Sequence, residues 1–255
     1  MMRYMDKRPF VLSIAGFDPS AGAGLLADIK TIEAIKAYGL GVCTANTVQT
    51  DEGFYQCEWT NPETIKFQLQ VLLKAYKIKA VKIGIVQNEK LLNELLDMIK
   101  KYNSNTKIVL DPVLKSTSGH RFQQAGDFLS EETVKKITLL TPNYEEIEQL
   151  RPLFSMERTI KAFMVHTNIL LKGGHHPAEK GKDVLYEKGK ENSVLFPSSI
   201  GKMYEKHGSG CVLSSAITTY LALGLPLHEA YKKAKQYTES ILMSNTTKLG
   251  YHLWK

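Results

Sequence analysis

Cysteine and long apolar runs are both scarce in this chain. Its 255 residues include only three cysteines, Cys43, Cys57 and Cys211, which are too few and too scattered for a disulfide framework or a C-x-x-C metal site. No segment approaches the roughly 18 to 20 unbroken apolar residues of a membrane-spanning helix. The apolar stretch Phe10–Gly16 is too short for the core of a signal peptide. These absences predict a soluble protein of the reducing cytoplasm.

The charge balance excludes a disordered or fibrous protein but leaves the partner open. The chain is 43% hydrophobic and 23% charged, with 33 Lys and Arg against 26 Asp and Glu, a formal net charge of +7. This composition is typical of a globular protein. The lysine pairs at 100–101, 135–136 and 232–233 fall in amphipathic helical patterns, where they are expected to face solvent. We therefore expect no nucleic acid and no membrane as a partner.

Short apolar runs alternate with stretches of helical period along the whole chain. The strand-length runs are Phe10–Ala15, Leu40–Thr44, Val81–Ile85, Lys107–Leu110, Ile137–Thr141, Ile169–Leu171, Val184–Glu187 and Val194–Phe196. Helical spacing of apolar residues covers Leu25–Ile35, Ile65–Tyr76, Leu91–Ile99, Cys211–Leu223 and Leu227–Met243. No repeat or linker divides the chain, so we predict one domain over residues 1–255. The alternation predicts an α/β fold, a three-layer α/β/α arrangement with a mainly parallel central sheet.

In such a sheet, ligands bind beyond the carboxyl ends of the strands. The first strand run opens into the glycine-rich loop Gly16–Gly24, which lets the backbone approach a ligand at a helix N-terminus. The pattern Gly22-x-Gly24-x-x-Ala27 formally matches a dinucleotide fingerprint. Three residues intervene after the strand, however, and no strand-end acid follows about 20 residues on, which argues against nicotinamide binding. Asp28 falls in the first helical turn, where a solvent-exposed carboxylate would be equally favoured by the helix dipole.

Further polar residues follow later strand runs. Asp111 comes directly after Lys107–Leu110 and is placed for a metal ion or a magnesium-bound phosphate, or simply for capping a turn. Asn143 and Glu146 form an Asn-x-x-Glu pattern, which also describes a helix capping box. Lys172 precedes two glycines and is suited to contact a phosphate, although a tight turn at a strand end has the same pattern.

The segment His207-Gly208-Ser209-Gly210-Cys211 stands immediately before a long apolar helical pattern. Its glycines let successive N–H groups converge on one point, and the helix dipole adds positive potential there. We therefore predict an anion-binding site at Gly208, Ser209 and Gly210. Cys211 falls in the first turn of the helix, where we expect its thiol to ionise more readily than a free cysteine. The alternative is a buried, unreactive cysteine.

Six short motifs occur along the chain in a characteristic order. They are Ser13–Gly24, Lys82-Ile83-Gly84, Leu110-Asp111-Pro112-Val113, Thr141-Pro142-Asn143, Lys172-Gly173-Gly174-His175 and His207–Cys211. In this order they resemble the ribokinase-like superfamily, and within it the hydroxymethylpyrimidine/phosphomethylpyrimidine kinases of thiamine biosynthesis. The resemblance implies a single ribokinase-like kinase domain and a homodimer. It also implies phosphoryl transfer from ATP, with Mg²⁺, to the hydroxymethyl group of an aminopyrimidine and to its monophosphate.

The resemblance also implies roles for particular residues. Those at the family's pyrimidine positions are Gly16, Asp28, Gln49 and Val113. Those at its magnesium and phosphate positions are Asp111, Asn143, Glu146 and, at a nucleotide phosphate contact, Lys172. By the same resemblance Gly208, Ser209 and Gly210 form an anion hole, and Cys211 takes the role of catalytic base that Asp fills in many relatives.

The chain departs from the family pattern near the expected pyrimidine. Ile85 stands where the family usually has Met, and Tyr204-Glu205-Lys206-His207 replaces the usual Asn-Thr-His before the anion hole. A pyridoxal or pyridoxine kinase is therefore the alternative activity, and a non-catalytic ligand-binding relative is the alternative of another class. The composition of Ser116-Thr117-Ser118-Gly119 predicts a mobile segment.

Overall fold

The computed structural model describes residues 8–115, 121–122, 129–174, 179, 181–190, 192–197 and 201–252. Its strands are β1 (Phe10–Phe17), β2 (Tyr38–Gln49), β3 (Phe54–Trp59), β4 (Ile78–Ile83), β5 (Lys107–Leu110), β6 (Leu139–Leu140), β7 (Asn168–Leu171), β8 (Asp183–Tyr186) and β9 (Ser193–Leu195). Its helices are α1 (Gly24–Ala34), α2 (Pro62–Ala75), α3 (Glu89–Tyr102), α4 (Glu131–Val134), α5 (Tyr144–Leu150), α6 (Met156–Met164), α7 (Ser209–Ala222) and α8 (Leu227–Leu242).

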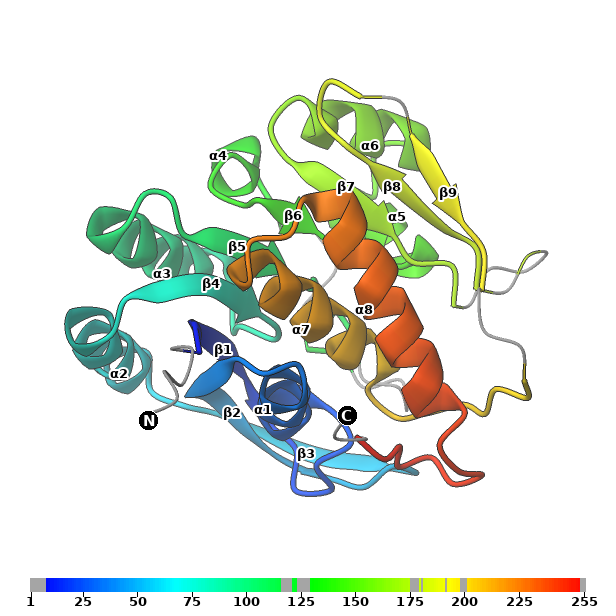
Figure 1. The fold of residues 1–255 in the computed structure, drawn as a ribbon. Coiled ribbons are helices and arrows are strands. Elements are labelled where there is room, and N and C mark those ends of the chain that lie inside the picture. Colours follow the sequence, from blue (N-terminus) through cyan, green and yellow to red (C-terminus); the bar gives the residue numbers. More distant parts are fainter. Residues whose placement is uncertain are drawn as a thin grey trace, which may run out of the picture.

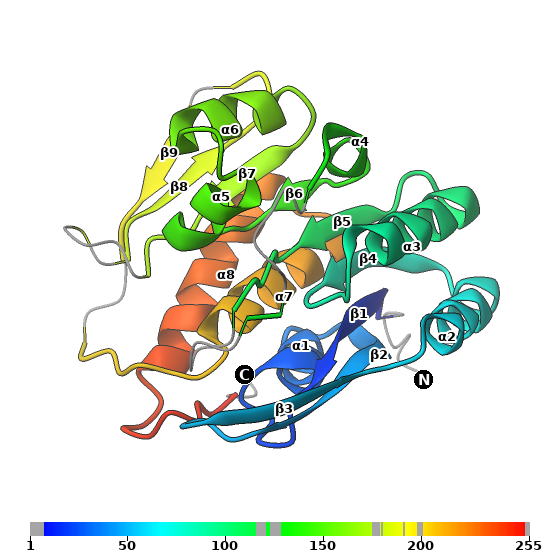
Figure 2. The same ribbon diagram turned by 180° about the vertical axis from the view of Figure 1, so that it is seen from behind.

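One sheet of nine strands runs through the described part of the chain, in the order β3-β2-β1-β4-β5-β6-β7-β8-β9. The pairs from β2 through β7 are parallel, whereas β3, β8 and β9 add on as antiparallel strands. Helices α1, α7 and α8 cover one face of the sheet (Figure 1), and α2 to α6 cover the other (Figure 2). The predicted three-layer, mainly parallel α/β fold is confirmed.

The layers are held together by apolar faces on helices and strands. Helix α3 buries Leu92, Leu95, Leu96 and Ile99, a spacing that places them on one side of the helix against the sheet. On the opposite face, strand residues such as Val109 pack against α7 and α8. The central strands are therefore covered on both faces, which explains their continuous apolar runs.

The sequence located most elements but not all of them. Strand β5 has the predicted bounds, and α2 covers the predicted helical run from Ile65 but begins earlier, at Pro62, with the Asn61 side chain accepting from the Glu63 N–H at 2.8 Å. Strand β3 was not predicted, because it lies at the sheet edge with residues such as Tyr55 72% exposed and so has no buried apolar run. Helices α4 and α6 were also not predicted. The segment 116–119 lies outside the described residues.

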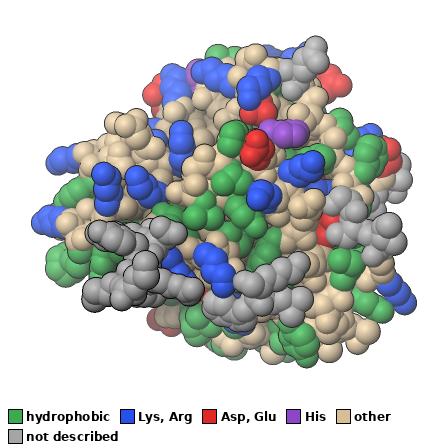
Figure 3. Space-filling model, in the orientation of Figure 1, with side chains coloured by type: hydrophobic (Ala, Val, Ile, Leu, Met, Phe, Trp, Pro, Cys, Tyr) green, Lys and Arg blue, Asp and Glu red, His purple; other side chains and the backbone are tan. Residues whose placement is uncertain are grey.

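The excess of basic residues is spread over the surface. In Figure 3 the Lys and Arg side chains lie scattered over the visible face, with acidic and hydrophobic side chains between them. Lys101, Lys135, Lys232 and Lys233 are exposed, as their helical patterns predicted. No helix among the described residues is both long and apolar enough to cross a membrane.

Candidate active site

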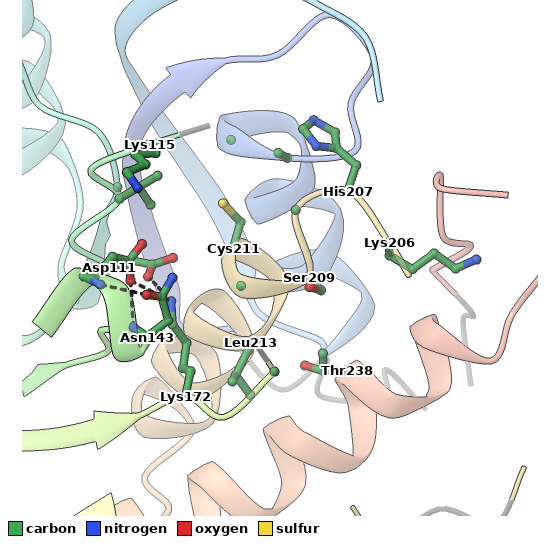
Figure 4. Close-up of a pocket in the computed structure, with 18 of the residues that line it drawn as sticks. Asp111, Lys115, Asn143, Lys172, Lys206, His207, Ser209, Cys211, Leu213 and Thr238 are labelled. Carbon is green, nitrogen blue, oxygen red and sulfur yellow. Dashed lines mark hydrogen bonds and ion pairs between the residues drawn. The ribbon is translucent and has the colours of Figure 1, made fainter. Parts of the chain in front are cut away.

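A cavity of about 620 Å³ opens where the central strands end, and α7 begins at its wall. The carboxyl ends of β1, β4, β5, β6 and β7 meet at one edge of the sheet because these strands are parallel. Gly16, Gln49, Val113, Asp111 and Lys172 all line this cavity, as do Asn143, Glu146 and residues 208–211. The structure thus brings together every predicted site residue except Asp28. Figure 4 shows Asp111, Asn143, Lys172, Ser209 and Cys211 among them.

The Lys172 ammonium connects two strand ends. It donates to the Asp111 carboxylate at 2.6 Å and lies 3.7 Å from a carboxylate oxygen of Glu146. A Cβ placed on Gly210 would lie 3.4 Å from the Lys172 nitrogen, so the same ammonium also approaches the start of α7. Asn143 and Glu146 form the predicted capping box of α5, each side chain accepting a main-chain N–H of the other at 2.8 Å. The residues that cap α5 therefore also line the candidate phosphate site.

The two carboxyl groups of this cluster have opposite pKa shifts. Burial would raise the pKa of Asp111, but the positive charges of Lys172 and Lys82 outweigh it and hold that pKa below its usual value. Burial raises the pKa of Glu146 to about 7, since the attraction of Lys172 is offset in part by the nearby Asp111 charge. Asp111 is thus ionised at neutral pH, whereas Glu146 titrates near it.

Helix α7 begins at the cavity, which residues 208–211 line. Gly208 is its N-cap in a left-handed conformation with φ of 75°, and a Cβ there would lie 2.2 Å from the Gly22 carbonyl oxygen. Only glycine fits this close approach between the two glycine-rich loops. The first N–H groups of a helix, here those of Ser209, Gly210 and Cys211, have no acceptor within the helix. The Ser209 N–H donates to the main-chain oxygen of Lys206 at 3.4 Å. Ser209 and Gly210 belong to the predicted anion hole, and the start of a helix with its dipole is suited to an anion.

The thiol of Cys211 differs from the sequence-based expectation. It lies in the first turn of α7 as predicted and accepts the Gly24 N–H. Burial nevertheless raises its pKa to about 11, because the attraction of Lys82 is opposed by the nearby Asp28 and Asp111 charges as well. The expectation that this thiol ionises readily is therefore wrong for the unliganded protein. Its desolvated surroundings outweigh the helix dipole.

Asp28 lies behind the cavity wall, not on the molecular surface. Helix α1 begins at Gly24, so Asp28 falls in its second turn and is fully buried. It accepts hydrogen bonds from the Lys82 ammonium at 2.8 Å and from the Ser13 and Ser215 hydroxyls, both at 2.5 Å. Lys82 itself lines the cavity. Any direct contact with a ligand would thus be made by Lys82, with Asp28 as its counterion.

The opposite end of the cavity is formed by β1, β2 and the loops after β4 and β5. Gln49 donates to the Thr47 hydroxyl at 2.8 Å, which orients its amide beside the cavity. Gly16 faces Ile85 so closely that a Cβ on Gly16 would lie 2.5 Å from the Ile85 side chain. Val113 completes this wall. The combination of a hydrogen-bonding amide and apolar walls fits a small heteroaromatic ring.

Sequence reasoning missed two hydrogen-bonded side-chain pairs of the site. Lys82 lies in one of the six motifs, but nothing in its neighbourhood along the chain shows that Asp28, 54 residues away, is its partner. His207 pairs with Asp18 at 2.9 Å and so ties the start of α7 to the glycine-rich loop. Burial would raise the pKa of Asp18, but the hydrogen bonds from His207 and Ser20 outweigh it and lower that pKa.

Comparison with known proteins identifies the family. The family model described as phosphomethylpyrimidine kinase matches residues 18–253. The hydroxymethylpyrimidine/phosphomethylpyrimidine kinase of Aquifex aeolicus (strain VF5) is 35% identical over 253 residues, which cover 95% of this chain and 98% of that protein. The crystal structure of phosphomethylpyrimidine kinase from Clostridium difficile 630 is 34% identical with a TM-score of 0.75 and covers 91% of this chain and 98% of that one.

A second solved structure is similar in fold at lower identity. It is the pyridoxal kinase from Staphylococcus aureus in complex with AMP-PCP and pyridoxal, 26% identical with a TM-score of 0.77, covering 93% of this chain and 88% of that one. The match to the phosphomethylpyrimidine kinase model spans nearly the whole chain, and the sequence identity to that group is higher. The chain belongs to the hydroxymethylpyrimidine/phosphomethylpyrimidine kinase family and has its ribokinase-like fold.

Proposed function

We propose that the chain is a hydroxymethylpyrimidine/phosphomethylpyrimidine kinase of thiamine biosynthesis that uses ATP. It transfers a phosphoryl group first to the hydroxymethyl group of 4-amino-5-hydroxymethyl-2-methylpyrimidine and then to the monophosphate. The observation that carries this proposal is one cavity that holds the anion hole, the Cys211 thiol and the Lys172 cluster together. Phosphoryl transfer depends on positioning and charge neutralisation, and these groups supply both.

Cys211 is the proposed proton acceptor. In the first reaction the hydroxymethyl oxygen forms a bond to the γ-phosphorus of ATP, the bond from that phosphorus to the β-phosphate oxygen breaks, and ADP leaves. The hydroxyl proton passes to the sulfur, which must be ionised when it receives the proton. The nearby Lys82 ammonium stabilises that thiolate electrostatically. The N–H groups at residues 208–210 would meanwhile hold the transferred phosphoryl group.

The proposed nucleotide-binding side of the cavity consists of Lys172, Asn143, Asp111 and Glu146. Lys172 would contact a phosphate of ATP, with Asn143 beside it. Mg²⁺ binds through one or two carboxylates and otherwise prefers water and substrate phosphates, so Asp111 and Glu146 fit an ion that arrives with the nucleotide. The described residues hold no group of three His, Cys, Asp or Glu suited to a closed metal site. When bound there, the ion would neutralise charge on the phosphates.

Gly16, Gln49 and Val113 form the proposed pyrimidine pocket, with Asp28 acting through Lys82. Pyridoxal carries a hydroxymethyl group on a ring of similar size, and the fold likeness to a pyridoxal kinase in complex with pyridoxal keeps it as the second candidate acceptor. Residues 1–255 would act as one catalytic domain in a cytoplasmic homodimer, a state that sedimentation velocity of the full chain would test.

The deciding experiment measures ADP release with Mg²⁺-ATP and three acceptors offered separately: the aminopyrimidine alcohol, its monophosphate and pyridoxal. Cys211→Ala is assayed in parallel, and Cys57→Ala is the matched control because Cys57 lies on the edge strand β3, away from the cavity lining. Turnover of both pyrimidines that collapses only in Cys211→Ala supports the proposal. Turnover of pyridoxal alone would replace the substrate, and no turnover with any acceptor would favour a non-catalytic binding protein.

A further inference from the structure

Lys206 stands two residues before the N-cap of α7 and is only 4% exposed. Its side chain leaves the cavity wall and extends toward the C-terminal segment (Figure 4). There its ammonium donates to the main-chain oxygen of Asn245 at 2.6 Å, to the side-chain oxygen of Asn245 at 2.9 Å and to the main-chain oxygen of Thr247. We call these three acceptors the oxygen cage.

The oxygen cage belongs to a tight turn that its own hydrogen bonds define. The side-chain oxygen of Asn245 also accepts the N–H and the hydroxyl of Thr247, both at 2.9 Å, and its amide donates to the Leu249 carbonyl at 2.9 Å. A lysine ammonium has three protons, which match the three cage oxygens. Among the described residues, no ion pair joins Lys206 to a carboxylate, so neutral groups compensate its buried charge: the three cage oxygens and the Tyr204 ring, whose centroid lies 5.7 Å from the ammonium.

Three neutral oxygens around a buried positive charge constitute a cation site. Carbonyl oxygens arranged in this way can replace the hydration shell of a monovalent cation. Here the cation is covalently attached to the chain, and it joins two segments about 40 residues apart in sequence, the loop before α7 and the C-terminal turn. Without the ammonium, the main-chain oxygens of Asn245 and Thr247 would lose the donor that they share, while the Asn245 side-chain oxygen would keep only its bonds from Thr247.

The C-terminal turn also contacts the loops that form the anion hole. The Lys248 carbonyl accepts the His207 N–H at 2.9 Å. Leu249 packs so closely on the glycine-rich loop that a Cβ on Gly22 would lie 2.8 Å from it. A shift of the turn would therefore move His207, and with it the N-cap Gly208. Displacements of about 1 Å at a catalytic group are enough to lower turnover about 10²-fold.

We propose that Lys206 is a positioning residue, a tethered cation whose ammonium fills the oxygen cage and thereby holds the anion hole in place for phosphoryl transfer. This inference rests on the proposed kinase function. It requires the positive charge at the cage but not the covalent tether. An added cation should therefore replace the side chain once space has been made for it.

The test uses the full chain with Lys206→Ala, which removes three methylenes and the ammonium. Turnover with the aminopyrimidine alcohol is measured in a sodium-free buffer with added ammonium, potassium or n-propylammonium. Tetramethylammonium at the same ionic strength is the control, since it is bulky and has no N–H to donate. Lys248→Ala is the matched variant, because it removes another lysine of the same segment whose side chain pairs with Glu52 outside the oxygen cage.

We expect Lys206→Ala to lower kcat about 10²-fold with little change in the KM of the pyrimidine. Added ammonium, potassium or n-propylammonium should then raise the kcat of this variant at least about tenfold. Wild type and Lys248→Ala should not respond to these cations. Full activity of Lys206→Ala without added cation would overturn the inference. So would a loss that none of the three cations restores, or one that tetramethylammonium restores equally well.

A second measurement separates this inference from the proposed function. Amide hydrogen exchange of residues 243–252 reports the turn whether or not the chain is a kinase. Exchange that is faster in Lys206→Ala and slowed by ammonium supports the tethered cation even if the wild type transfers no phosphoryl group, whereas unchanged exchange overturns it. If Lys206→Ala does not fold, Lys206→Met keeps the side-chain volume. It should show fast exchange and low turnover that added cations do not correct, and normal exchange would contradict the proposal.

Discussion

The most specific prediction concerns Cys211, because burial in the fold sets the pKa of its thiol and the proposed reaction requires its thiolate. Burial raises that pKa from the ordinary 9.0 to about 11, which corresponds to an added cost of about 3 kcal/mol for forming the thiolate. At pH 8 only about one molecule in a thousand would carry the thiolate in the unliganded protein. If that thiolate is the base, kcat/KM for the pyrimidine should rise about tenfold per pH unit from pH 7 to 10.

Two assays check this expectation. The first is the pH profile of kcat/KM for the wild type and for Cys211→Ala, which should lose about 10²- to 10⁴-fold in turnover and the slope together. The second is the rate of alkylation by iodoacetamide in a Cys43→Ser/Cys57→Ser background, where Cys211 is the one thiol left. Its alkylation rate should still be rising at pH 10, since only the thiolate reacts.

Either assay can refute the reasoning. An alkylation rate that levels off at or below pH 8.5 would show that the helix dipole and Lys82 outweigh burial. Wild-type turnover in Cys211→Ala would remove the thiol from the mechanism. A flat profile of kcat/KM from pH 7 to 10 would show that no group with a pKa near 11 has to ionise in the free enzyme.

Three further predictions concern the surrounding site. Gly208→Ala places a Cβ against the Gly22 loop and should lower turnover about 10²-fold, whereas Gly224→Ala, also at positive φ but in open space, should affect stability alone. Lys82→Met leaves its buried carboxylate partner unpaired and should cost about 3 to 5 kcal/mol in urea unfolding, with the exposed Lys79→Met on the same strand as a neutral control. Folding favours protonated Glu146, so the stability from this group is present below its ordinary pKa of 4.5 and lost as pH rises through about 7. Glu146→Gln should therefore gain in melting temperature over the wild type between pH 5 and 8.5, and equal curves would contradict the raised pKa.

The local sequence was enough to predict many of the residues that line the site. Asp111 and Lys172 could be located because each follows a continuous apolar strand run, and parallel strands end at a common edge. The capping box of Asn143 and Glu146 and the glycine N-cap of α7 were also readable, because helix starts depend on a few neighbouring residues. The sequence by itself thus determined the fold class, the edge of the sheet that forms the site and most of the residues found there.

The tertiary structure decided the electrostatics. The burial of Cys211 in the folded protein raises the pKa of a thiol at a helix N-terminus, and the charges around it come from residues as far apart as Asp28 and Lys82. The oxygen cage lies about 40 residues beyond Lys206, and two of its three oxygens are main-chain atoms, which no side-chain pattern predicts. Desolvation and Coulomb interactions depend on distances through the folded protein and not on separation along the chain. Residue identity and spacing therefore located the candidate catalytic groups, and the packing around them determined their partners and the direction of their pKa shifts.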